Sequence, residues 1–276
     1  MPVVTPSLAL IIFIAGIIAG GLGSLLGVAG GVFLVPFLNL GLNLSFPVAA
    51  AISLATVIAT SSSVSAARSR EQVINLRLGM LLEVATAGGS LLGGITAQLV
   101  APAFLQRLFG ATMMAIALTI LTRLNRRNVI LDPTVSTGVL GGRFVEEESG
   151  GEVQYRVKRL PLALVASFIA GNVSSLLGIG GGVIKVPVLN AWCGIPLRVA
   201  AATSAFMIGV TATPGAIIYY GRGQLVPALA AAAVLGVQLG SWRALEVAAK
   251  VPAKWLKLLL AVVLIIVAIL MFVRPR

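Results

Sequence analysis

The chain alternates long apolar stretches with short polar ones. Apolar segments lie at about residues 7–26, 30–42, 46–67, 76–100 and 103–122 in the first half, and at about 160–177, 181–193, 197–219, 225–242 and 255–273 in the second. Most are long enough for a membrane-spanning helix, which needs roughly 18 or more apolar residues. The second segment of each half is too short to cross the hydrocarbon core fully as a helix. The pattern predicts an all-α polytopic membrane protein.

The two halves of the chain repeat one unit. Residues 24–39 read SLLGVAGGVFLVPFLN and residues 175–190 read SLLGIGGGVIKVPVLN, and this offset of 151 residues continues without a gap to Ser90 and Ser241. We therefore expect two transmembrane repeats of about five segments each, residues 1–122 and 160–276. Paired interruptions at matching positions of two halves are typical of transport sites.

A polar connector, residues 123–159, joins the repeats. Its runs RFVEEE and EVQYRVKR flank Ser149-Gly150-Gly151 and resemble the arms of a β-hairpin. It is either a solvated connector or a segment with a regulatory or partner-binding role.

Composition narrows the function. Hydrophobic residues make up 58% of the chain, charged residues 10%, and the mean hydropathy is +1.06, far from a soluble domain. The net charge of +12 comes from basic loops without an aromatic-interleaved face, so nucleic acid is not an expected partner. The chain has one cysteine, Cys193, and no histidine. We therefore expect no internal disulfide, no metal site and no cofactor. The sequence also shows no nucleophile paired with a base and no P-loop, so we expect no enzymatic activity.

The basic residues also predict the orientation. If all five segments of each half change sides, 15 of the 20 lysines and arginines fall on the side of the connector. If the short segments instead dip and return, the split worsens to 13 against 6. Because basic loops face the cytoplasm, the first arrangement predicts a cytoplasmic connector and extracytoplasmic termini in the cell membrane. An odd number of crossings inverts the second repeat relative to the first.

Glycines interrupt each repeat just before its short segment. There the backbone can leave the helical conformation, and the next helix begins with unpaired N–H groups that attract anions. Two such breaks, related by inversion, place two positive helix ends near one site in the middle of the membrane. The candidate binding glycines are Gly27, Gly30, Gly31, Gly178, Gly180, Gly181 and Gly182. The other glycine pairs at small-xxx-small spacing indicate close helix packing: Gly16/Gly20, Gly23/Gly27, Gly89/Gly93 and Gly236/Gly240.

Polar side chains accompany the breaks. Ser24 and Ser175 precede them and either donate to an anion or satisfy freed backbone carbonyls. Asn39 and Asn190 follow, and either bind substrate or cap the short segment. The third segments of both repeats are rich in serine and threonine, which suits either a wet pathway or interhelical hydrogen bonds.

Two ionisable residues lie at membrane depth. Lys185 follows the second break, where the first repeat has Leu34, and either balances an anion or snorkels to the interface. Glu83 pairs with Lys185, carries a coupling proton, or reaches the cytoplasmic surface.

The duplicated pattern S-L-L-G-x-x-G-G-x-x-x-x-P-x-L-N resembles the sulfite exporter TauE/SafE family of membrane permeases. The resemblance covers nearly the whole chain outside residues 123–159, although Ala29 stands where a third glycine is often expected. It implies transport of small sulfur-containing anions such as sulfite, thiosulfate or organosulfonates.

We therefore predict a secondary carrier that works by alternating access around a midplane site, with the small anion and the lipid bilayer as its partners. An anion channel on the same scaffold and a non-transporting sensor module are the alternatives. The sequence leaves open whether the protein forms a homodimer.

Overall fold

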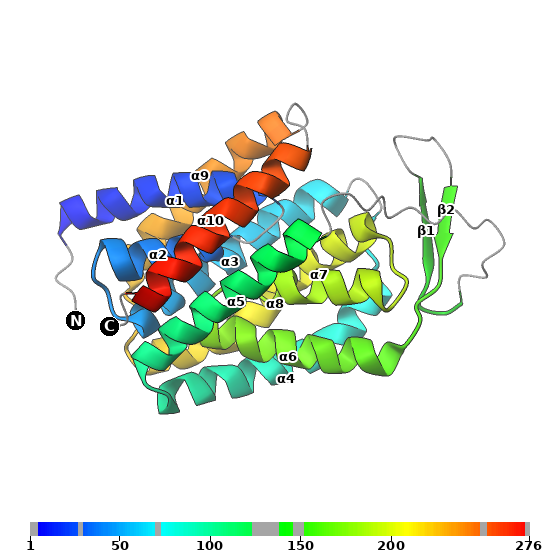
Figure 1. The fold of residues 1–276 in the computed structure, drawn as a ribbon, viewed down its shortest axis with the longest axis horizontal. Coiled ribbons are helices and arrows are strands. Elements are labelled where there is room, and N and C mark those ends of the chain that lie inside the picture. The colour runs from blue at the N-terminus through cyan, green and yellow to red at the C-terminus, as the bar shows by residue number, and fades with distance from the viewer. Residues whose placement is uncertain are drawn as a thin grey trace.

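A computed structural model of the chain describes residues 5–26, 30–69, 73–122, 138–145, 152–248 and 253–273. Within these residues the elements follow the predicted segments closely (Figure 1). They are α1 (Pro6–Leu26), α2 (Gly31–Pro36), the π-helix η1 (Phe37–Gly41), α3 (Phe46–Ser69), α4 (Leu76–Leu99), α5 (Pro102–Thr122), β1 (Gly142–Val145), β2 (Glu152–Tyr155), α6 (Leu160–Leu177), α7 (Gly182–Ala191), α8 (Leu197–Gly221), α9 (Pro227–Ala248) and α10 (Ala253–Val273).

Helix α9 is the element whose end differs most from the expectation. It continues past residue 242 to Ala248, through Arg243, Leu245 and Glu246. Arginine, leucine and glutamate are good helix formers, so intrinsic propensity carries the helix beyond the apolar stretch that hydropathy detects.

The main helix contacts join the two repeats. Helix α1 packs against α9, α4 against α6, α3 against α8, and α5 against α10. At the offset of 151 residues, α6 corresponds to α1 and α9 corresponds to α4. The contact of α1 with α9 and the contact of α6 with α4 are therefore equivalent by the repeat. Exchanging the repeats leaves these pairings unchanged. The repeats therefore interlock rather than form two separate bundles.

Glycines permit these close contacts. A Cβ atom on Gly89 of α4 would overlap the carbonyl oxygen of Phe168 in α6, and one on Gly240 of α9 would overlap that of Ile17 in α1. Gly16, Gly93 and Gly236 face partner backbones in the same way. The packing role predicted for three of the four glycine pairs is thus confirmed. The fourth pair includes Gly27, which lies outside the described residues.

The path of the chain alternates between two ends of the bundle. Figure 1 shows that α1 begins and α10 ends at one end, whereas the β-hairpin lies at the other. The Lys158 N–H donates to the Cys193 carbonyl at 2.9 Å, so α7 ends beside the residues that precede α6. Helix α7 therefore returns the chain to the end where α6 began. This is the order expected if all five segments change sides; the side of the membrane remains a prediction.

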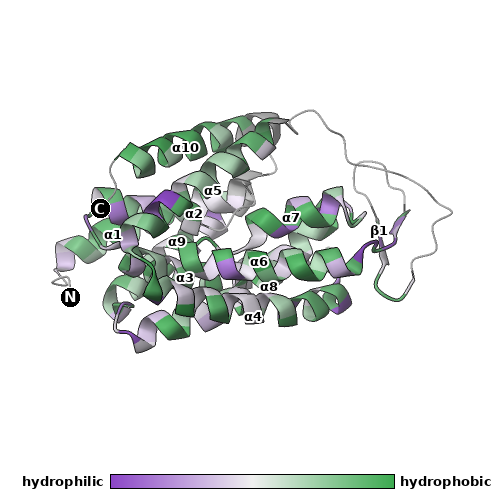
Figure 2. Cartoon of the chain, turned by 60° about the horizontal axis from the view of Figure 1, so that its bottom comes forward, coloured by the Kyte–Doolittle hydropathy of each residue, from purple (hydrophilic) through white to green (hydrophobic). Residues whose placement is uncertain are grey.

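The bundle is apolar outside and partly polar inside. Large hydrophobic side chains such as Val84 and Leu99 are 77% and 81% exposed, and Figure 2 shows hydrophobic residues along most of the helices. Many serines and threonines, in contrast, are buried between the helices, among them Ser53, Thr56, Ser204 and Thr211. Six of the described helices (α1, α3, α4, α5, α6 and α8) are long and apolar enough to span a membrane. An apolar exterior of this extent suits lipid, and the protein is a multi-pass membrane protein.

The connector contributes a docked β-hairpin. Strands β1 and β2 pair antiparallel, with Phe144 opposite Val153. Phe144, Val153 and Tyr155 are each no more than 6% exposed. They share an apolar cluster with residues that precede α4 or belong to the α7–α8 region, among them Val73, Leu189, Cys193 and Val199. The hairpin is therefore part of the packed structure at this end of the bundle.

Asn75 links the start of α4 to the β-hairpin and to α8. Its side chain accepts the Leu78 N–H at the start of α4 (3.0 Å) and donates to the Leu140 carbonyl (2.8 Å) and the Tyr155 hydroxyl (2.9 Å). Its backbone N–H donates to the Thr203 hydroxyl in α8 at 3.0 Å. Burial raises the pKa of the Tyr155 phenol above its usual range.

We expect Asn75→Ala to lower the free energy of unfolding by about 1–3 kcal/mol, because it removes a helix cap and the donor to the partly buried Leu140 carbonyl. Thermal unfolding in detergent would measure the loss. Thr96→Ala is the matched control, since that hydroxyl bonds only its own helix, at Leu92. Equal midpoints for the two variants would show that Asn75 does not anchor the hairpin.

Candidate functional site

The second glycine break is a sharp reversal between α6 and α7. Helix α6 ends at Leu177, and its last turn is closed by the Gly178 N–H, which donates to the Ser174 carbonyl at 2.8 Å. Gly178, Gly180 and Gly181 have positive φ angles of 71°, 69° and 23°. Residues with a Cβ adopt this region at a cost, so the glycines are what allows the reversal. Helix α7 then begins at Gly182.

The first short helix packs directly against this break. The Ser53 hydroxyl of α3 donates to the Gly178 carbonyl at 2.5 Å. A Cβ atom on Gly31, the first residue of α2, would lie 2.6 Å from the same carbonyl oxygen. Ala50 closes the other side, 2.8 Å from a Cβ built on Gly178. The start of one short helix therefore meets the break that precedes the other. Of the candidate glycines, Gly27 lies outside the described residues.

Lys185 lies one turn into α7 and is buried in the bundle, 1% exposed. Its Nζ donates to the Thr211 hydroxyl of α8 at 3.2 Å. That hydroxyl is 2.9 Å from Glu83 Oε1 on α4, to which it can donate. A single hydroxyl thus connects the ammonium and the carboxylate, and three helices supply the three groups. The Lys185 ammonium does not extend to a polar surface.

Two buried hydroxyls near the start of α7 have no hydrogen-bond partner among the described residues. They belong to Ser204 of α8 and Ser174 of α6, which are 1% and 0% exposed. A Cβ atom on Gly182 would lie 3.1 Å from Ser204 Oγ, and one on Gly181 would lie 3.5 Å from Ser174 Cβ. Buried polar groups are normally paired, so unpaired groups beside a helix N-terminus suggest a polar ligand.

Ser175 is engaged with neighbouring helices. Its hydroxyl lies 2.6 Å from the Ser90 hydroxyl of α4, and its carbonyl accepts the Tyr219 hydroxyl of α8 at 3.2 Å. This contact ties the end of α6 to two other helices. Its counterpart Ser24 lies half-buried near the end of α1.

The two asparagines make the same contact in both repeats. Asn39 Nδ2 donates to the Leu44 carbonyl and Asn190 Nδ2 donates to the Ile195 carbonyl, each at 2.9 Å. Of the two roles considered for them, these contacts correspond to closing the turn after the short helix. The Asn39 Oδ1 atom is buried without a partner.

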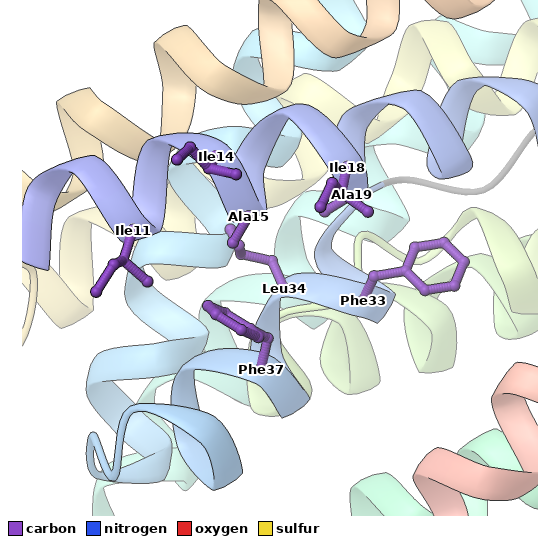
Figure 3. Close-up of a pocket in the computed structure, with 8 residues that line it drawn as sticks. All are labelled: Ile11, Ile14, Ala15, Ile18, Ala19, Phe33, Leu34 and Phe37. Atoms are coloured by element: carbon purple, nitrogen blue, oxygen red, sulfur yellow. The ribbon is translucent and has the colours of Figure 1, made fainter.

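The first repeat has a different environment at the position of Lys185. Leu34 contributes there to an apolar cavity of about 360 Å³ between α1 and the α2–η1 segment (Figure 3). All eight lining residues are apolar: Ile11, Ile14, Ala15, Ile18, Ala19, Phe33, Leu34 and Phe37. No polar side chain lines this cavity. It therefore lacks the kind of groups that could bind an anion beside the second break.

Sequence reasoning placed Ser204 and Thr211 on a hydroxyl-rich helix but did not connect them to Lys185. It missed Ser174 altogether, because the first repeat has Gly23 at that position and the repeat gives no signal there. The contact of Glu83 with Thr211 joins residues 128 positions apart, and no local pattern reveals it.

Comparisons with known proteins test the resemblance to a family of membrane permeases. The family model described as sulfite exporter TauE/SafE matches residues 12–271. The chain is 26% identical to the probable membrane transporter protein YunE of Bacillus subtilis, over 93% of this chain and 94% of that protein. It is 37% identical to sulfite exporter TauE/SafE family protein 6 of Arabidopsis thaliana, over 30% of this chain and 19% of that protein. No solved structure matches the chain significantly.

The family match spans nearly the whole chain and includes both repeats and both glycine breaks. The predicted family is confirmed: this chain belongs to the sulfite exporter TauE/SafE family of membrane transporters.

Proposed function

We propose that the protein is a secondary carrier that moves small sulfur-containing anions across the cell membrane. The anion binds beside the second glycine break, between the two repeats and near the middle of the bilayer. The two repeats have inverted topologies, and rocking of one against the other exposes the site to each side in turn. The family description and the name of the plant relative support the choice of sulfur anions.

The observation that carries the proposal is the set of hydrogen-bond donors at the start of α7. The hydroxyls of Ser174 and Ser204 have no partner, and the backbone N–H groups of Gly181 and Val183 have no acceptor among the described residues. Lys185 adds a buried positive charge one turn away. Sulfite and sulfonate groups present several acceptor oxygens and a negative charge, so they complement a site that consists largely of donors.

A ligand panel tests this function. The purified protein would be mixed with sulfite, thiosulfate, sulfoacetate, taurine or sulfate, and its thermal midpoint measured. A ligand that binds only the folded state raises the midpoint by mass action. The anions that do so should show saturable uptake into proteoliposomes. Stabilisation by none of them, with no uptake, would overturn the proposal. Uptake that never saturates would indicate a channel.

Lys185→Met should weaken anion uptake at least about tenfold in kcat/KM, because one charge-assisted hydrogen bond is worth roughly 1.5–3 kcal/mol. The variant leaves Glu83 without its positive neighbour, so the double variant Lys185→Met/Glu83→Gln is measured beside it. Lys185→Arg keeps the charge and should retain more of the uptake. Wild-type kinetics for both folded methionine variants would show that Lys185 does not bind the anion.

A further inference from the structure

Glu83 introduces a negative charge where the proposed function requires an anion to bind. Its Oε1 atom faces the Thr211 hydroxyl at 2.9 Å, whereas its Oε2 atom is buried and has no hydrogen-bond partner within the part of the chain that the structure describes. A purely structural counter-ion for Lys185 would be expected to contact the ammonium directly. Here one hydroxyl separates the two groups, and half of the carboxylate remains unpaired.

On the basis of the proposed function, we propose that Glu83 is a proton site and that one proton accompanies each anion through the carrier. The proton is taken up by a Glu83 carboxylate oxygen as the anion binds near Lys185, and it leaves when the anion leaves. The anion thereby travels with a proton in the same direction.

The charges around the site support this coupling. Without substrate, the negative Glu83 balances the positive Lys185 and the pair is neutral. A bound monovalent anion would leave the group with one net negative charge, in a region where an unbalanced charge costs a few kcal/mol or more. Protonation of Glu83 restores neutrality. The anion and the proton therefore favour each other's binding, and by linkage the effect is reciprocal.

Lys185 is the only charged group among the described residues that acts on Glu83. The Thr211 hydroxyl contacts the carboxyl group, whereas the Thr86 hydroxyl donates to the backbone carbonyls of Leu82 and Glu83. Helix α6, which packs against α4, carries no ionisable side chain. On α8 the ionisable residues are Arg198, Tyr219 and Tyr220, each at least eight positions from Thr211 along the helix. On α4 itself the other ionisable residue is Arg77, which is exposed near the helix start.

The symmetry-related set of positions, Val234, Leu34 and Thr60, does not form a second proton site of this kind. At the offset of 151 residues, Glu83 corresponds to Val234 and Lys185 corresponds to Leu34. Thr211 corresponds to Thr60, whose hydroxyl bonds only carbonyls of its own helix, at Thr56 and Val57. The helices therefore occur twice, whereas Glu83, Lys185 and the Thr211 hydroxyl that links them occur together once. This predicts one proton for each anion.

The test uses proteoliposomes with the membrane potential clamped at zero and a pH difference of one unit, acidic outside. The probes are radiolabelled methanesulfonate and isethionate, which are monovalent organosulfonates whose charge does not change near neutral pH. Coupling to one proton should concentrate the anion about tenfold inside, because one pH unit and a tenfold concentration ratio store equal free energy. Glu83→Gln, which keeps the acceptor for Thr211, should equilibrate the anion without concentrating it. Thr60→Val, at the position that corresponds to Thr211 in the first repeat, should concentrate it like wild type.

The outcomes separate the two proposals. If the wild-type protein moves neither probe nor any anion of the panel, the proposed function is wrong. If it moves a probe saturably but never concentrates it under the pH difference, the carrier stands and the proton site is wrong. Equal concentration by wild type and by Glu83→Gln would also overturn the assignment of Glu83.

Discussion

Gly89→Val should abolish the folded bundle, whereas Gly88→Val at the adjacent position should leave it intact. A Cβ atom on Gly89 would overlap the Phe168 carbonyl oxygen of α6, and backbone cannot move aside as a flexible side chain does. A Cβ atom on Gly88 meets nothing within 4 Å. Both variants carry the same cost in helix propensity, so the difference between them isolates the contact of α4 with α6.

We expect Gly89→Val to lower the free energy of unfolding by more than about 3 kcal/mol, which is the upper end of the usual range for overpacking, because two helix backbones must separate. Size-exclusion chromatography of the detergent-solubilised protein and its thermal midpoint would report the change. We expect a similar loss for Gly240→Val, because a Cβ atom there would overlap the Ile17 carbonyl oxygen in the equivalent contact of α9 with α1. A folded Gly89→Val protein with an unchanged midpoint would contradict the close packing of α4 and α6.

The fold was largely predictable because its signals are long and repeated. Apolar segments of about 20 residues identify spanning helices, and the offset of 151 residues shows that each element occurs twice. The symmetry of the structure preserves even details, such as the contacts of Asn39 and Asn190 with the carbonyls five residues later. Helix boundaries were least predictable where residues of high helix propensity continue beyond the apolar stretch, as at the end of α9.

The site was predictable in its residues but not in its connections. The glycines and Lys185 stand out against an apolar background. The contact of Ser53 with Gly178 joins the two repeats, and the Glu83–Thr211–Lys185 series joins three helices. Such contacts depend on how helices distant in sequence pack, which single-sequence periodicity does not encode. A comparison of the two halves also does not detect residues that differ between the repeats, such as Ser174, which corresponds to Gly23 in the first repeat.

Gly178→Ala is expected to remove transport almost completely. The residue has φ of 71°, where an alanine costs roughly 1–2 kcal/mol, and its Cβ would lie 2.8 Å from Ala50 Cα and 2.9 Å from the Ala50 carbonyl oxygen. Either the break or α3 must shift to accept the methyl group. The same carbonyl group of Gly178 receives the Ser53 hydroxyl, so a shift there also disturbs the contact between the repeats.

Gly221→Ala is the matched control, because a Cβ on Gly221 meets nothing within 4 Å and its φ is not positive. Saturable anion uptake, measured per folded protein after size-exclusion chromatography, should be near wild type for Gly221→Ala and at least about a hundredfold lower for Gly178→Ala. That ratio corresponds to about 3 kcal/mol, the combined cost of the backbone strain and a displaced site in which a small misplacement is enough to lose binding. A folded Gly178→Ala protein with normal uptake would mean that the anion does not bind at the second break, since that break cannot accept the methyl group and keep its shape.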